Sequence, residues 1–567
     1  MPLSRRALAV LLTAGLAVGG CGPAPTATEA PSGSGPTASA AAPPVPTEIP
    51  FEPAAWPPAG SACKDPAHGG RLGRIEALDA LTVRFTLCSP DGAFRTRLAH
   101  PSLAVVDATP IARLGADGNA GRTVAGTGPY RLGSWREDNV ELALASPATA
   151  GSLLETVVIG WEADAGARAA SVLGATVDGI DTPDAAAAEA MATQPEVAVI
   201  PRPDLATAYL GFGSGTAFAT VRVRRAIAMG LDTSALAASF GPGSIPATAT
   251  APCSVAGGCG GEAWWAFNAP SATAALAAAK FDLKTVYPLR IPDAPMPGLP
   301  DPAAAAAAVG AQLQANLGLT VEPEAVPAAT FAADLAAGRI EGLYLAGVAS
   351  ALADASGFLE PLFGPSVTST AAGSATGVAD ALETLAHTTG ASARAAILAT
   401  ANDAVRATVP ISPLVHPGSV VVYGSDVSGV AVSPLGLDAL GSFVPGDRHQ
   451  LVYIGASEPV GGWCGNQATL DAFRLCGLVT EGLYGFGPGT LDPEPRLAVR
   501  CATSADATTW TCRLHPDVTF QDGMLLDAGD VLASFVAQWD AGSPMRTGWP
   551  ERAFASWDAL FGAPAGG

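Results

Sequence analysis

The segment over residues 508–539 constrains the fold most, because it has apolar faces that it cannot bury by itself. Apolar and polar residues alternate over 509–514, which predicts a half-buried strand, and residues 518–520 predict a second strand after a turn. Asp527 then precedes an apolar helix, for which it is a suitable N-cap. Two strands and one helix are too few to be stable alone. The partners of this segment must therefore lie earlier in the chain.

The composition indicates a folded chain with more than one domain. The 567 residues are 49% apolar and 14% charged, which favours two or three domains with sizeable cores over disorder. The formal net charge of -21 argues against a nucleic-acid partner, since phosphate binding needs clustered Lys or Arg. An acidic surface in contact with water is the simpler interpretation.

The first residues predict export from the cytoplasm. Arg5 and Arg6 precede an apolar run over 7–18 that is too short to span a bilayer as a mature helix, which is typical of a secretory signal peptide over residues 1–20. The run ends in LAVGGC, which resembles the lipobox of bacterial lipoproteins. This resemblance implies acylation of Cys21, and the alternative is an ordinary cysteine after a plain cleaved signal.

Residues 21–60 are rich in Pro, Ala, Ser and Thr and predict a disordered tether. The folded part is then expected at the outer face of the cytoplasmic membrane, on the cell surface or in the periplasm. We expect contact with the membrane through the lipid anchor only.

The cysteines predict disulfides. Nine cysteines less Cys21 leave eight, an even number in an oxidising compartment. Cys501 and Cys512 fall opposite each other if a hairpin turns at residues 506–507, and Cys253 and Cys259 flank a Gly-rich loop. We also pair Cys464 with Cys476, and Cys63 with Cys88. A zinc site is disfavoured, because no two cysteines have the C-x2-C spacing and the His residues are scattered.

Strands and helices alternate through the rest of the chain, which predicts an α/β protein. Residues 71–106 predict two strands and a short helix. Over 221–240 we expect helix, with Arg222, Arg224 and Arg225 on a solvated face. A long helix is expected to begin at Asp301 and to end at Gly318. Two α/β blocks linked by crossing segments predict a cleft between two lobes.

Four motifs along the chain resemble a known family. In order they are GTGPYRLGSW at 126–135, VRVRRAIAMGLD at 221–232, GFLEPLF at 357–363 and VSGVAVSPLG at 427–436. They resemble the family 5 extracellular solute-binding proteins, the peptide, nickel and oligosaccharide receptors of ABC importers. The beginning of that family looks like LVYIGASEP, LVTEGLYGF and LDPEPRLAVR, which lie between residues 451 and 500 here.

The order of these motifs predicts a circular permutation. The ends of the family fold would be joined through residues 441–450, and new ends would open in a small domain between Gly567 and about Ser61. Permutation is tolerated where native termini are close and the new break falls in an exposed loop. A tandem pair of receptors with the second one truncated is the competing account. The expected parts are small domain II (61–125 and 491–567), lobe I (126–235 and 426–490) and lobe III (236–425).

The resemblance implies a periplasmic-binding-protein-like fold with two lobes and a small third domain around a cleft. It implies a receptor, expected to be a monomer, that closes on a peptide or other small solute by hinge motion and delivers it to an ABC transporter permease. No catalysis and no cofactor are implied. The sequence also lacks the G-x-S-x-G, H-E-x-x-H, G-x-G-x-x-G and G-x-x-x-x-G-K motifs.

The ligand is harder to infer from the resemblance. Peptide receptors of this family place a tryptophan and an amine-binding aspartate before this motif, and alignment on Phe358 puts Val348 and Ala351 at those positions, with Asp354 nearby. A buried ammonium without its carboxylate would lose a charge-assisted hydrogen bond, about 1.5–3 kcal/mol. Peptide binding of the usual kind is therefore in doubt, and nickel is weakly supported because there is no His cluster.

Six residues on elements that face the expected cleft are candidate ligand contacts: Phe212, Trp264, Tyr344, Asp354, Phe473 and Arg474. Each has a structural alternative. Phe212 and Tyr344 suit a core equally well, Asp354 suits a helix cap and Arg474 suits a surface charge. A degenerate receptor that serves as a cell-surface sensing or interaction module also remains open, whereas a secreted enzyme would need a reactive constellation that the sequence does not display.

Overall fold

The computed structural model describes residues 51–65, 68–109, 111, 120–146, 153–181, 185–364, 367, 377–549 and 551–562. The chain divides into two units, residues 1–50 and 51–567. The predicted signal peptide, Cys21 and most of the predicted tether lie outside the described residues. The structure of the second unit is built on three sheets of five, six and seven strands.

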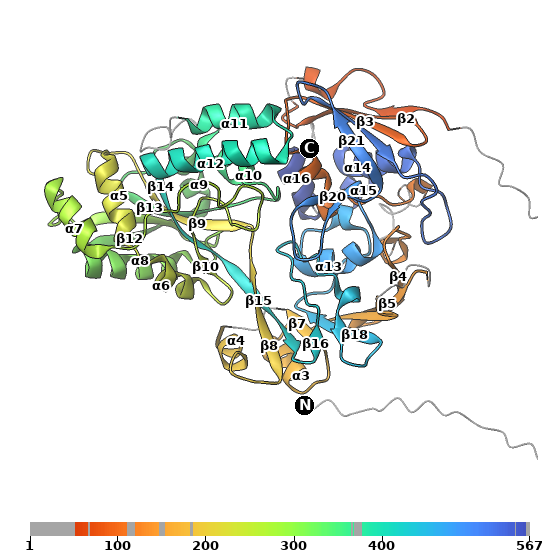
Figure 1. Ribbon diagram of the computed structural model, residues 1–567, viewed down its shortest axis with the longest axis horizontal. Helices are drawn as coiled ribbons and strands as arrows, with labels where there is room; N and C mark the ends of the chain where they lie inside the picture. The colour runs from red at the N-terminus through yellow and green to blue at the C-terminus, as the bar shows by residue number, and fades with distance from the viewer. Residues whose placement is uncertain are drawn as a thin grey trace, which may run out of the picture. The chain divides into compact units, whose positions relative to one another are not determined.

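The five-stranded sheet shows which elements cover the apolar faces of residues 508–539. Its order is β1-β2-β3-β22-β21, so strands from both ends of the second unit share one sheet (Figure 1). Trp510 on β22 pairs with Phe85 on β3 in antiparallel register, and the following helix α14 packs against β1, β2 and β3. The bounds are β1 Ala54–Trp56, β2 Leu72–Asp79, β3 Thr82–Leu87, β21 Ala498–Thr503, β22 Thr509–Leu514 and α14 Ala528–Trp539. The prediction that the partners lie earlier in the chain is confirmed.

Aromatic side chains fill the space between this sheet and its helices. The Phe85 ring lies 5.4 Å from the Phe94 ring and 5.3 Å from the Phe535 ring, and all three are fully buried. Burying each such ring contributes about 1.5–3 kcal/mol. The helices that complete this small domain II are α1 Phe94–Leu98, α15 Pro544–Gly548 and α16 Ala555–Phe561.

Two expectations for this region are wrong in part. Residues 518–520 form no regular strand but only an isolated bridge between Thr519 and Leu525, because the chain turns back within a few residues. The tether expected to reach residue 60 ends earlier, since β1 pairs with β2. The Trp56 ring contacts the Trp539 ring with a centroid distance of 4.4 Å, which fixes β1 on the domain.

The seven-stranded sheet forms lobe I and draws on distant parts of the chain. Its order is β4-β5-β6-β18-β7-β15-β8. The strand β18, from residues 450–455, lies between β6 and β7 and runs parallel to both. The strand bounds are β4 Tyr130–Trp135, β5 Asn139–Leu144, β6 Thr156–Trp161, β7 Gly179–Asp181, β8 Val197–Pro203, β15 Gly418–Gly424 and β18 Gln450–Gly455. Helices α3 Ala165–Leu173, α4 Ala185–Met191 and α13 Leu470–Val479 pack on this sheet.

The six-stranded sheet forms lobe III, in the order β10-β14-β9-β13-β11-β12. The strand bounds are β9 Ala206–Phe212, β10 Ile245–Pro246, β11 Tyr287–Pro292, β12 Val321–Val326, β13 Leu343–Ala349 and β14 Ile411–His416. The helix bounds are α5 Val221–Met229, α6 Thr233–Ala237, α7 Ala269–Ala278, α8 Pro302–Leu317, α9 Ala328–Ala336, α10 Ser356–Phe363, α11 Val378–His387 and α12 Ala391–Thr408. The helix α8 ends as predicted: Asp301 caps its start, and Gly318 closes it with a φ of 68°.

Among the described residues, the chain crosses between lobe I and lobe III twice, from β8 to β9 and from β14 to β15. The two crossings lie side by side, because the Asp204 amide donates a hydrogen bond to the Pro417 carbonyl at 2.9 Å. The boundaries expected at 235 and 425 are therefore replaced by crossings at about 204 and 417. Helices α5 and α6 belong to lobe III.

Arg224 does not lie on a solvated face as expected. It is 2% exposed, and its guanidinium donates to four carbonyl groups, among them those of Thr408 and Val409 at the end of α12. The carbonyls at a helix end have no partner within the helix. Arg224 therefore joins α5 to the C-terminus of α12.

Four disulfides link the pairs that we predicted: Cys63–Cys88, Cys253–Cys259, Cys464–Cys476 and Cys501–Cys512. Cys501 and Cys512 are direct partners across the β21–β22 hairpin. Within the described part of the chain, no helix combines the length and the apolar character that crossing a bilayer requires.

Candidate functional site

Two cavities lie between small domain II and the segment of lobe III from β13 to α12. Their volumes are about 590 Å³ and about 300 Å³, the range of small-molecule sites. Both are lined by Arg71, Arg97 and Glu360. These three side chains therefore stand where the cavities meet, and we call the two cavities together the inter-lobe cleft.

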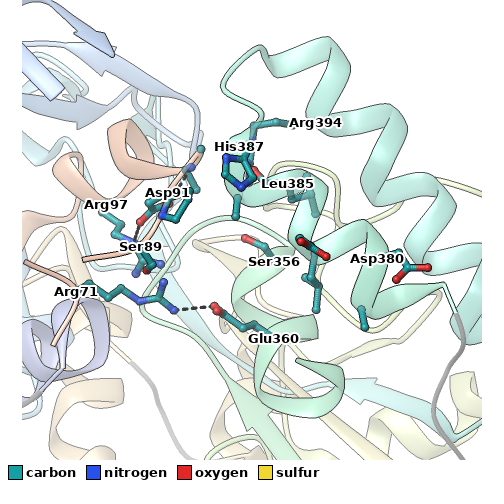
Figure 2. Close-up of a pocket in the computed structure, with 17 residues that line it drawn as sticks. Arg71, Ser89, Asp91, Arg97, Ser356, Glu360, Asp380, Leu385, His387 and Arg394 are labelled. Carbon is teal, nitrogen blue, oxygen red and sulfur yellow. Dashed lines mark hydrogen bonds and ion pairs between the residues drawn. The ribbon is translucent and has the colours of Figure 1, made fainter. Parts of the chain in front are cut away.

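An ion pair spans this cleft. Arg71 precedes β2, and its Nη2 donates to Oε2 of Glu360, on α10, at 2.8 Å; Figure 2 shows the two side chains reaching toward each other from opposite walls. The side chains are 32% and 43% exposed. Burial by itself lowers the pKa of the Arg71 guanidinium, but the carboxylates of Glu360 and Asp91 outweigh it and raise that pKa. Arg71 is thus positively charged at any physiological pH.

A second pair, Asp91 with Arg97, forms the floor of the cleft on the domain II side. Arg97 Nε donates to Asp91 Oδ2 at 2.5 Å, and Arg97 Nη1 donates to the Leu560 carbonyl. Burial raises the pKa of Asp91, but Arg97 and Arg71 lower it further, so the net shift is downward. Both side chains are under 10% exposed, which makes the pair part of the scaffold rather than a free binding group.

Asp354 also serves the scaffold. Both of its carboxylate oxygens accept from Arg394 Nη2 at 2.9 Å, and Oδ1 accepts from the amide and hydroxyl of Ser356 at the start of α10. Arg394 in turn donates to the carbonyls of Leu385 and Thr388. The carboxylate therefore ties α10 to α11 and α12, and Asp354 is 1% exposed. It bonds the Ser356 amide at the start of α10, but the N-cap position of that helix is Ala355.

The smaller cavity includes Ala351, the residue that the motif alignment predicts at the position of the family's amine-binding aspartate. Ala351 lines that cavity, whereas Val348 lies in the core at 7% exposure. Of the described residues around the smaller cavity, Glu360 alone carries a carboxylate. Neither Arg71 nor Glu360 was among the residues predicted from the sequence to contact a solute. Glu360 lies inside the GFLEPLF motif, which was the one signal that could have drawn attention to it.

Phe473 and Arg474 are brought together at a third cavity of about 370 Å³. The Phe473 ring meets His100 edge-on at 5.5 Å. Arg474 is 1% exposed, so a surface charge is excluded. Its guanidinium pairs with three aspartates, Asp181, Asp438 and Asp471, at 2.9 to 3.1 Å. Burial lowers the pKa of Arg474, but Tyr453 and these aspartates raise it far more.

The remaining candidates lie in lobe III and are not among the residues that line the three cavities above. Phe212 is fully buried beside Phe218, and Tyr344 packs edge-on against Tyr209 at 6.2 Å. Burial raises the pKa of Tyr344. Trp264 is half-buried against the lobe III core. The structure thus places Phe212 and Tyr344 in the core, as their alternative proposed.

The described part of the chain contains no group of three or more His, Cys, Asp or Glu side chains that could hold a metal ion.

The sequence profile of the bacterial extracellular solute-binding proteins, family 5 Middle, matches residues 47–370. Over 66 residues the chain is 38% identical to the glutathione-binding protein GsiB of Shigella flexneri and 36% identical to that of Escherichia coli (strain K12). Each of these matches spans only 12% of the length of the curated relative.

The structure of HbpA2 from Haemophilus parasuis is similar over 66% of this chain and 75% of its own, with a TM-score of 0.59 and 23% sequence identity. This likeness shows the fold, and the predicted periplasmic-binding-protein-like α/β class is confirmed. The profile match covers more than half of the sequence. The chain belongs to the bacterial extracellular solute-binding proteins of family 5, a family of non-enzymatic solute-binding receptors of ABC transporters.

Proposed function

We propose that this chain is a lipid-anchored extracytoplasmic receptor that captures a small solute and delivers it to the permease of an ABC importer. The observation that carries the proposal is the inter-lobe cleft, whose smaller cavity is lined by Ala351, the predicted counterpart of the family's amine-binding residue. A pocket of this size, lined by a few convergent charged groups, is suited to a small solute.

Hinge closure is supported by the way the lobes are joined. Only the two crossings near 204 and 417 lead from the lobe I sheet to the lobe III sheet in the described part of the chain. The Arg71–Glu360 pair bridges the cleft, and a pair this exposed contributes about 0–1 kcal/mol. The pair by itself therefore opposes opening of the cleft only weakly, and we expect the lobes to take up a solute and close on it by hinge motion.

The names of the relatives and the residues of the cleft both bear on the class of solute. The curated relatives are named glutathione-binding proteins, so glutathione and short peptides are the first candidates. The methyl group of Ala351 offers no carboxylate to an ammonium, which separates this chain from the usual peptide receptor of the family. Binding of a peptide-like solute would therefore depend on other charged groups in the cleft.

The lipid anchor is proposed from the LAVGGC motif alone. The chain expressed in a bacterium with radiolabelled palmitate should incorporate label, and Cys21→Ser should abolish incorporation while leaving export intact. Label that persists in the variant would argue against an anchor at Cys21.

We also propose that the chain is a circular permutation of the family fold. Residues 450–455 lie at the centre of the lobe I sheet, and residues 498–514 complete the small-domain sheet. A reordered chain with residues 450–562 placed before 51–440 should fold with the same four disulfides and a similar melting temperature. A reordered chain that fails to fold would favour the tandem account.

A thermal-shift screen of the full chain in mild detergent tests the receptor proposal. The screen uses peptides, glutathione, oligosaccharides and metal chelates. A ligand at 100 times its Kd adds about 2.7 kcal/mol to the free energy of unfolding, so a true solute should raise the melting temperature reproducibly. A flat response to every class, from a chain that melts cooperatively, would replace the receptor with a sensing or interaction module.

A further inference from the structure

We infer that the Arg71–Glu360 pair is a recognition site for a zwitterionic end group, an ammonium and a carboxylate on the same carbon atom as in an α-amino acid. The inference rests on the proposed receptor function and names the chemistry of its solute. Glu360 would take the ammonium, and Arg71 would take the carboxylate. In the structure the two side chains bond to each other, with Nη2 of Arg71 2.8 Å from Oε2 of Glu360.

The geometry distinguishes this pair from the other charges of the cleft. Asp91 and Arg97 bind each other with both side chains buried, and Arg97 also binds a backbone carbonyl. Asp354 and Arg394 are likewise buried and hold three helices together. Arg71 and Glu360 are partly exposed, and a single hydrogen bond joins them among the described residues. They are the pair that a solute can open.

The need to pair both charges of the opened ion pair selects the class of solute. When the pair opens, a positive and a negative group are left facing the cleft. A cation pairs with Glu360 but leaves Arg71 without its hydrogen-bonded partner, so that Asp91, itself bonded to Arg97, is the remaining carboxylate that acts on it. An anion pairs with Arg71 but leaves Glu360 without its hydrogen-bonded partner. A neutral solute leaves both charges unpaired. A zwitterion alone satisfies both groups, through charge-assisted hydrogen bonds that include a two-pronged contact from the guanidinium to the carboxylate.

The position of the pair fits the size of such a solute. Arg71 and Glu360 line both cavities, so an end group held between them could extend its side chain into either. Ala351 and Leu352 line the smaller cavity without charge. The larger cavity offers polar groups from α11, among them Asp380 and His387 (Figure 2). The site would thus recognise the charged end closely and leave the remainder of the solute less restricted.

The test is a thermal-shift panel on the full chain with L-α-amino acids and γ-glutamylglycine, each also as its N-acetyl, methyl ester and doubly blocked form. Free zwitterions should stabilise the protein, and each blocked form should bind at least tenfold more weakly. The inference predicts a crossed pattern in the variants. Glu360→Gln should lose the preference for a free ammonium only, and Arg71→Gln should lose the preference for a free carboxylate only.

Glu458→Gln is the matched control. Its pair with Arg122 has a distance of 2.7 Å and side-chain exposures of 43% and 38%, close to those of the cleft pair. This variant should bind like the parent chain. A pair that only latches the lobes shut would change the affinity for all forms equally, which would overturn the inference.

The outcomes separate the inference from the proposed function. Stabilisation by oligosaccharides, chelates or blocked peptides, with none from zwitterions, keeps the receptor and overturns this inference. A flat response to every compound overturns the receptor and the inference together. Unchanged melting of the two variants without ligand shows that they remain folded.

Discussion

At the scale of single residues, Asp204 is a titratable group at the junction of lobe I and lobe III. It lies between β8 and β9, where its amide is bonded to the Pro417 carbonyl of the other crossing. Burial raises the pKa of its carboxyl group to about 6; the Arg202 guanidinium opposes this shift and Asp181 adds to it. The folded state therefore keeps a proton on Asp204 that the unfolded chain releases near pH 3.8.

This difference predicts a pH-dependent effect of Asp204→Asn. Between pH 3.8 and about 6 the folded state binds more protons, so the contribution of Asp204 to the free energy of unfolding falls as the pH rises. At pH 7.5 the variant should be more stable than the parent by roughly 1–2 kcal/mol, a value reduced for partial exposure. At pH 4 the two should melt alike. Melting curves across this range check it, and equal destabilisation at both pH values would contradict it.

For Arg474 we predict a large loss of stability on substitution, because its charge is fully buried. Arg474→Met leaves Asp181, Asp438 and Asp471 without their shared cation, and breaking a buried pair in this way costs about 3–5 kcal/mol. Chemical denaturation should show this loss. Arg513→Met is the control, since its pair with Asp79 is more than half exposed and should change stability by less than about 1 kcal/mol. Similar losses in both variants would refute the buried network.

Residue roles were the hardest feature to predict from the sequence. Apolar alternation marks Phe212 and Tyr344 as inward-facing, but it cannot tell whether the inside is a core or a pocket. Arg71 and Glu360 are 289 residues apart, and no local pattern joins them. Their contact depends on how two domains meet, which periodicity does not encode.

At the scale of elements, the helix α14 carries the clearest agreement between sequence and structure. Asp527 accepts hydrogen bonds from the amides of Gly529 and Asp530, and the Asp530 side chain accepts one from the Asp527 amide, which completes a capping box. This arrangement satisfies amides that have no partner within the helix. The start of this helix could be predicted because it is determined by side chains within the first turn.

The cap leads to a direct test. Asp527→Ala should lower the free energy of unfolding by about 1 kcal/mol, within the range measured for N-caps. Asp492→Ala, which changes an exposed carboxylate in the same domain, should have almost no effect. Denaturant midpoints of the two variants compare them. If the Asp492 variant loses as much as the Asp527 variant, general charge and not capping would be responsible.

The elements that were missed share a cause. The chain over 518–526 folds back too sharply for a ladder to form, although its apolar residues alternate. The crossing at Asp204 lies within an almost continuous run from β8 to β9, and nothing in the sequence marks where one sheet ends and the next begins. Such boundaries depend on long-range pairing.

At the scale of the whole second unit, lobe I and small domain II are each completed by distant segments of the chain, whereas the strands of the lobe III sheet all lie between residues 206 and 416. The apolar faces of residues 508–539 predicted partners earlier in the chain, and β3 is one of them. Motif order led to the expectation that residues 450–455 join lobe I, where β18 lies. The depth and charge of the cleft could not be predicted, because they arise where small domain II and lobe III meet.

Hydrogen–deuterium exchange of the full chain, with and without the best stabilising solute from the panel, tests the central claim most directly. If a solute binds between the lobes, the amides of residues 71–97 and 349–361 should exchange more slowly in its presence, because both segments line the cleft. The β21 edge of the small-domain sheet should be unchanged. Saturable binding with no slowing at either segment, or slowing confined to another region, would contradict a receptor that holds its solute in this cleft.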